Sequence, residues 1–79
     1  MGNTIKYLSE LSKGDRGRII KIEENRIAKR LIEMGLVPDR EFEVLYSDHG
    51  KKIVRTLNNL RIAIGEDIAK KILVEVYKK

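Results

Sequence analysis

The sequence predicts a mainly β fold: a small barrel of about five strands, with one amphipathic helix inserted after the first strand and a short helix before the last. Several short apolar runs alternate with polar residues at the period of two that is typical of strands. One longer segment instead has apolar residues at helical spacing. With 79 residues, 42% of them hydrophobic, the chain has room for one domain, over residues 1–79, and no second core.

The N-terminal part predicts an apolar lead-in, a turn and a first strand. Three apolar side chains form the lead-in, Ile5, Leu8 and Leu11, and the turn residues 12–15 should end it. Over residues 17–23, alternation puts Ile20 and Ile22 on one face together with Arg18, and Ile19 with Lys21 on the other. The strand therefore has one mostly apolar face.

A helix of three turns follows. Asn25 can cap its start, and the apolar stripe consists of Ile27, Leu31 and Met34, with Ala28 and Ile32 beside it. Gly35 lies where a left-handed cap belongs, and Pro38 blocks continuation of the helix. The helix should therefore end at about residue 34.

The C-terminal half predicts a hairpin, a further strand, a short helix and a last strand. Phe42, Val44 and Tyr46 alternate with residues 41, 43 and 45, and the turn at 47–50 leads into residues 53–57. Asn58-Asn59 can adopt positive φ in a tight turn before residues 60–64. Acidic residues 66 and 67 suit the start of a short helix, and residues 73–77 close the chain as a strand.

The order of these elements favours an SH3-like barrel. Closure of a small sheet relieves unpaired edges, so five short strands suggest a partly open barrel. A barrel of the oligonucleotide-binding type also has five strands and one helix, but its helix usually follows the third strand. Here the helix follows the first.

Composition limits the compartment and the partners. The chain has no Cys, so disulfides and thiolate chemistry are excluded and a cytoplasmic location is the default. No apolar run approaches the roughly 20 residues of a membrane helix, which argues against membrane insertion. A net charge of +5 permits binding to nucleic acid or to an acidic protein face. Aromatic residues do not interleave with the basic ones, which weakens a nucleic-acid-binding model.

The sequence offers no set of residues for catalysis or for a cofactor. The single histidine, His49, lies in a turn beside Asp48, and these two side chains cannot supply the three or four ligands of a metal site. No phosphate-binding glycine loop and no catalytic triad is recognisable. We therefore expect no enzyme activity, no small-molecule substrate, no cofactor and no tight iron binding.

Several motifs resemble the FeoA family. The family opens with two leucines three residues apart and a glycine-bearing turn before a strand, which here correspond to Leu8, Leu11, Gly14, Gly17 and Ile19. The most specific match follows, with Arg30-Leu31, Met34-Gly35 and Leu36-Val37-Pro38. The ending is similar to Ile62, Ile64, Ala69, Ile72 and Val74, so the resemblance spans residues 8–76. Two family glycines are replaced, by Asp39 and by Asn58-Asn59, residues that tolerate positive φ.

The resemblance implies an SH3-like domain that acts in the cytoplasm with the FeoB membrane transporter and influences ferrous iron uptake without chemistry of its own. It also implies similarity to the C-terminal domain of DtxR-type repressors. A domain that begins at residue 1 favours the transporter partner over a detached accessory domain of such a repressor. An exposed barrel edge could also pair with a second copy, which would give a homodimer.

The family signature supplies the candidate partner-binding residues, which are Arg30, Met34, Gly35, Leu36 and Pro38. A structural interpretation competes for most of them, because Leu31 and Met34 would fill the core, Gly35 would supply a left-handed backbone and Pro38 would stiffen a loop. Arg30 is the exception. Its guanidinium could pair with an acidic partner surface, or within the chain with Glu33 or Glu41.

Overall fold

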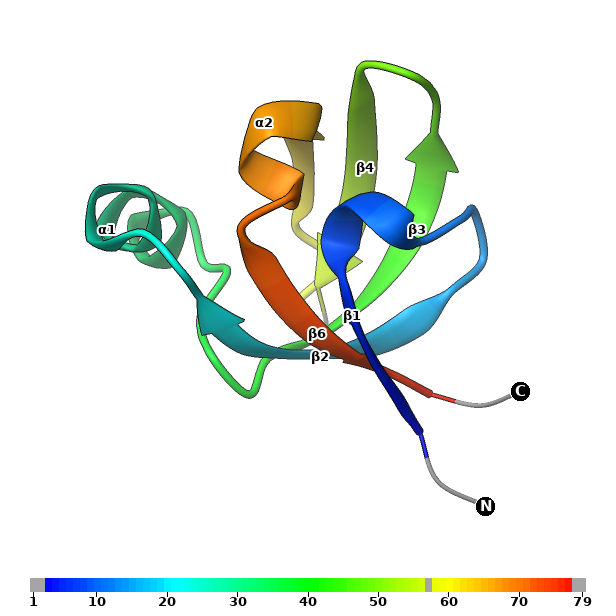
Figure 1. The fold of residues 1–79 in the computed structure, drawn as a ribbon, viewed down its shortest axis with the longest axis horizontal. Coiled ribbons are helices and arrows are strands. Elements are labelled where there is room, and N and C mark those ends of the chain that lie inside the picture. Colours follow the sequence, from blue (N-terminus) through cyan, green and yellow to red (C-terminus); the bar gives the residue numbers. More distant parts are fainter. Residues whose placement is uncertain (1–2, 57, 78–79) are drawn as a thin grey trace.

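The fold is a single antiparallel sheet curled into a partly open barrel. The computed structural model describes residues 3–56 and 58–77. Its elements are β1 (Thr4–Tyr7), the 3-10 helix η1 (Leu8–Glu10), β2 (Arg16–Ile22), α1 (Asn25–Glu33), β3 (Glu41–Ser47), β4 (Lys51–Thr56), β5 (Arg61–Gly65), α2 (Glu66–Ala69) and β6 (Ile72–Val76). The strand order is β1-β6-β2-β3-β4-β5 (Figure 1). This confirms the mainly β class, the inserted helix and the short helix before the last strand.

The described chain has six strands where the sequence suggested about five, because part of the lead-in is a strand. β1 pairs with β6 from Thr4↔Val76 to Tyr7↔Leu73, so the first and last strands are neighbours. Thr, Ile and Tyr favour extended backbone, but four residues are too few to display a period. Leu8 and Leu11, which follow this strand in the chain, are buried in the core.

One hydrophobic core fills the barrel and reaches under α1. Every strand except β1 contributes buried side chains, and so do the helices and two loops. These residues are Leu8, Leu11, Ile19, Ile22, Leu31, Leu36, Phe42, Val44, Val54, Ile62, Ile64, Ala69, Ile72 and Val74. Lys52 is also buried, at 3% exposure, and its Nζ donates to Ser47 Oγ at 2.8 Å. The long aliphatic part of the Lys52 side chain thus packs in the interior, while its ammonium group donates a hydrogen bond to a hydroxyl.

Two register shifts correct the face assignments made from alternation. In β2 the pairing with β6 shifts between Ile19 and Lys21, so Ile19 is buried at 1% exposure and Ile20 is only half-buried. The separation of Ile19 from Ile22 onto opposite faces was therefore wrong, because an extra residue in one strand reverses the side-chain alternation. In β3 a similar shift lies between Val44 and Tyr46, and Tyr46 is 44% exposed.

The end of α1 matches its sequence signals. Met34 is the C-cap residue, and Gly35 follows with φ +97°. The start differs slightly, since Glu24 rather than Asn25 occupies the N-cap position. Asp39 and Asn59 have φ of 70° and 63°, so the residues that replace two family glycines do adopt left-handed backbone.

Candidate functional site

A groove runs between α1 on one side and β5 with α2 on the other. Its volume is about 260 Å³. Eight residues line it: Arg26, Ile27, Arg30, Leu31 and Met34 from α1 and its C-cap, and Ala63, Ile64 and Ile68 from β5 and α2. In Figure 1, α1 stands to the left of the barrel and β5 and α2 lie on the side that faces it. We call this the α1–β5 groove.

The helical wall of the groove follows from the spacing of apolar residues in α1. Ile27, Leu31 and Met34 recur at intervals of four and three, which aligns them on one helix face. Leu31 is 3% exposed and belongs to the core, whereas Met34 is 46% exposed. The expectation that Met34 fills the core was therefore wrong: the stripe leaves the core at its C-terminal end and continues along the groove.

Both ends of α1 are tied to the barrel, which fixes the width of the groove. Before the helix, Glu24 accepts a hydrogen bond from Lys71 Nζ at 2.5 Å, and this bond lowers the pKa of Glu24. After the helix, the backbone of Gly35 approaches Leu60 so closely that a Cβ at position 35 would lie 2.9 Å from Leu60 Cδ2. The Asp39 N–H then donates to the Ile19 C=O at 2.6 Å.

Two arginines give the groove a positive rim. Arg26 and Arg30 are exposed and one helical turn apart. Within residues 3–56 and 58–77, neither guanidinium takes part in an ion pair or a side-chain hydrogen bond. The intrachain pairing of Arg30 with Glu33 or Glu41 is therefore absent there, and Glu41 instead accepts from Tyr77.

The five candidate partner-binding residues fall into different environments. Arg30 and Met34 both line the groove. Gly35 supplies the left-handed backbone, and Leu36 is a core residue at 1% exposure. Pro38 is exposed in the loop before β3 and does not line the groove.

The other wall of the groove escaped sequence reasoning. From the sequence, Ala63 was placed only within a strand, and no role was assigned to Ile68, which lies in the short helix α2. Ala63 and Ile68 follow the end of α1 at Glu33 by 30 or more positions, so no local spacing connects them to the helix. The sequence indicates this wall only by a small residue, Ala63, at the centre of a predicted strand.

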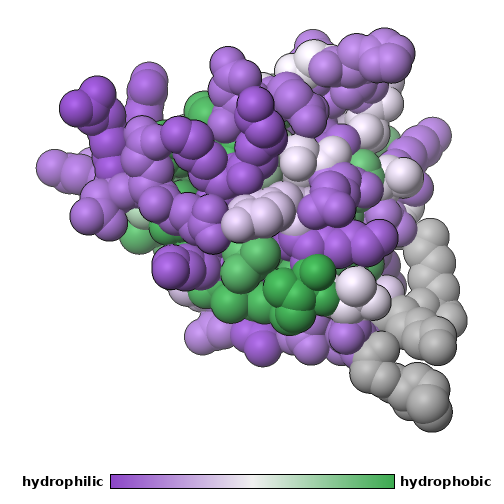
Figure 2. Space-filling view, in the orientation of Figure 1, coloured by the Kyte–Doolittle hydropathy of each residue, from purple (hydrophilic) through white to green (hydrophobic). Residues whose placement is uncertain are grey.

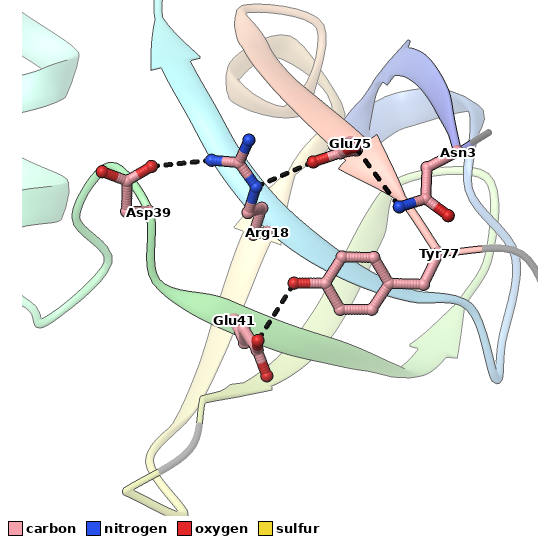
Figure 3. A network of polar contacts seen from close by, with 6 residues as sticks. All are labelled: Asn3, Arg18, Asp39, Glu41, Glu75 and Tyr77. Carbon is pink, nitrogen blue, oxygen red and sulfur yellow. Dashed lines mark hydrogen bonds and ion pairs between the residues drawn. The ribbon is translucent and has the colours of Figure 1, made fainter.

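A polar network on the outer face of the barrel links four parts of the chain (Figure 3). Arg18 of β2 donates from Nη1 to Asp39 and from Nε to Glu75, each at 2.7 Å. The hydrogen bond to Glu75 is the main cause of the raised pKa of Arg18. The Tyr77 hydroxyl donates to Glu41 at 3.1 Å, and burial together with this bond raises the pKa of Tyr77. The network joins the loop after α1 to β2, β3 and β6.

Two other surface features lie outside the α1–β5 groove. A cleft of about 250 Å³ beside the network has charges of both signs and includes Arg16, Glu41, Glu43 and Arg55 among its lining residues. An apolar patch lies over β6 and β2 in Figure 2, surrounded by polar surface. Ile5 of β1, next to β6, is 53% exposed.

The part of the chain that the structure describes contains no group of three or more His, Cys, Asp or Glu residues arranged to hold a metal ion. His49 is exposed in the turn between β3 and β4. None of the described helices combines the length and the apolar character that crossing a membrane requires.

Fold and groove define a small SH3-like barrel in which one helix stands off from an edge strand. The sequence model of the FeoA domain matches residues 6–76, and the chain belongs to this family.

Similar solved structures include proteins of the same family. A structure described as iron uptake regulatory protein (FeoA) is 32% identical, with a TM-score of 0.83 over 94% of this chain and 99% of that one. The FeoA protein from Chlorobium tepidum is 27% identical, with a TM-score of 0.79 over 92% and 71% of the two chains. A manganese-dependent transcriptional repressor, 19% identical, shares the fold, with a TM-score of 0.82 over 92% of this chain and 41% of the repressor. No curated protein matches the sequence.

Proposed function

We propose that this protein is a small cytoplasmic adaptor or regulator of ferrous iron transport, which acts by binding the cytoplasmic region of an FeoB-type transporter and performs no chemistry itself. Membership of the FeoA family supports this proposal. The structure that is 32% identical is described as an iron uptake regulatory protein, which points to the same process.

The observation that carries the proposal is the α1–β5 groove. It combines exposed apolar surface at Met34 with two guanidiniums, on Arg26 and Arg30, that take part in no ion pair or side-chain hydrogen bond among the described residues. Arginine and methionine are enriched where proteins bind other proteins. Because both ends of α1 are tied to the barrel, binding would cost little reordering of the groove.

The test is calorimetric titration of the full chain into the cytoplasmic region of the cognate FeoB, with and without guanine nucleotide and at two salt concentrations. We expect binding that weakens as salt rises, because the arginines would meet acidic groups. Arg30→Ala should weaken binding by roughly tenfold, the loss of one charge-assisted contact.

Lys29→Ala is the matched control, because it removes the same charge from the neighbouring position of α1 but Lys29 does not line the groove. It should bind as the unmodified protein does. Equal losses in both variants would mean that only overall charge matters and would contradict docking in the groove. Absence of binding in every nucleotide state would refute the proposed function.

A further inference from the structure

β5 is an edge strand whose outer backbone groups face the α1–β5 groove. It pairs only with β4, and it ends the strand order of the sheet. The Thr56 N–H donates to the Leu60 C=O, and the Glu66 N–H donates to the Gly50 C=O. Even-numbered residues of this segment therefore direct their backbone groups toward β4. Since direction alternates along a strand, Arg61, Ala63 and Gly65 direct theirs toward the open edge.

Within residues 3–56 and 58–77, no backbone hydrogen bond on that edge involves the N–H groups of Arg61, Ala63 and Gly65 or the C=O groups of Arg61 and Ala63, whereas the Gly65 C=O belongs to the N-cap of α2. An exposed row of N–H and C=O groups is a template for pairing with another strand. Ala63 also lines the groove, so the open edge and the apolar wall of α1 face the same space. A segment bound there would contact both.

The unpaired backbone groups of β5 favour an extended occupant, because an extended segment can pair with them as a further strand. An extended strand needs only about 4.8 Å beside β5 and can run through the groove along its length.

We infer that β5 accepts a strand from the partner, in a segment that alternates apolar and acidic residues; this inference rests on the proposed function and specifies its mode of binding. Ile62 and Ile64 face the core, so side chains opposite them would point inward, toward the apolar stripe of α1. Side chains opposite Arg61 and Ala63 would point outward. An acidic residue there would meet Arg61, and one near the helix would meet Arg30.

The experiment uses the full chain labelled with ¹⁵N and two probes: the cytoplasmic region of FeoB, and a synthetic peptide of four Asp-Val repeats with a Lys-Val peptide as its charge control. We expect the amide hydrogens of Arg61, Ala63 and Gly65 to exchange at least about tenfold more slowly when either FeoB or the Asp-Val peptide is bound, because they become hydrogen-bonded. The Lys-Val peptide should give no such protection.

Ala63→Pro is the diagnostic variant. Proline is tolerated where a strand's N–H faces outward, so the β4–β5 ladder keeps its hydrogen bonds while the edge loses a donor. Binding should weaken roughly tenfold or more. Ile5→Pro is the matched control on the other edge strand: the Tyr7 N–H donates to Glu10 rather than to β6, and alternation turns the Ile5 N–H outward as well. It should bind normally.

The outcomes separate the two proposals. If FeoB binds but the three amides stay unprotected, the strand-addition inference is overturned while the proposed function stands. The same conclusion follows if Ala63→Pro is folded and binds FeoB normally. If FeoB does not bind but the Asp-Val peptide protects these amides and requires the edge of β5, the proposed function fails and the inference holds for another partner. If FeoB does not bind and the Asp-Val peptide gives no protection, both proposals are overturned.

Discussion

Gly17 should be the glycine whose replacement destabilises the fold most. It lies in β2 opposite Val76 of β6 and Phe42 of β3. A Cβ at this position would lie 2.1 Å from the Glu75 carbonyl oxygen, where real Cβ contacts are not shorter than 3.0 Å. The obstacle is backbone, so a rotamer change cannot relieve it. In Gly17→Ala, β6 must retreat from β2 by about 0.9 Å.

That movement determines the expected cost. A retreat of this size would stretch the 2.8 Å bond from the Tyr77 N–H to the Arg16 C=O, and its neighbours in the β2–β6 ladder, past hydrogen-bonding distance. Two or three hydrogen bonds at about 1 kcal/mol each, with some loosening of the core, give a loss of about 2–4 kcal/mol. A domain of this length has a total stability of about 4–12 kcal/mol.

Urea unfolding followed by circular dichroism measures this loss. Gly65→Ala is the control, since an added Cβ there meets nothing within 4 Å, and its stability should change by less than about 0.5 kcal/mol. If Gly17→Ala is as stable as the unmodified protein, or if Gly65→Ala is equally damaged, then close approach of β2 and β6 is not what requires glycine at position 17.

Two further predictions concern α1 and the β3–β4 turn. Leu31→Ala should lower the free energy of unfolding by about 2–5 kcal/mol and Met34→Ala by less than about 1 kcal/mol, because only Leu31 is in the core; equal losses would contradict this division of the stripe. Hydrogen bonds from the Gly50 N–H and the Tyr46 hydroxyl lower the pKa of Asp48. Its stabilising effect is thus present above the pKa of the unfolded chain and is lost as pH falls through the folded pKa. Between about pH 5 and pH 2, Asp48→Asn should therefore lose less stability than the unmodified protein in acid titrations of thermal unfolding, and parallel curves would refute this.

Local signals predicted the elements well where they depend on neighbouring residues. The stop of α1 at Gly35 and the left-handed turns at Asp39 and Asn59 follow from the backbone preferences of those residue types. The SH3-like class also followed from the sequence, although β1 adds a strand at the start, so that α1 follows the second strand.

What could not be predicted depends on contacts between distant segments. β1 forms because it pairs with β6, which comes from the other end of the chain. The register shift next to Ile20 leaves no mark in the sequence, since Ile19, Ile20 and Ile22 are equally apolar. The groove was not predicted: the apolar stripe of α1 is a local pattern that the sequence shows, whereas Ala63 is brought to it by tertiary folding.

The pairing of β1 with β6 brings the two ends of the described chain together, with Thr4 opposite Val76. In Figure 1 both ends leave the barrel on the side away from α1. A short linker between them, with new termini opened in the exposed turn at residues 48–50, should therefore give a circular permutant with the same barrel. The same arrangement lets a neighbouring domain or a surface tether be attached at either end without obstructing the space beside β5.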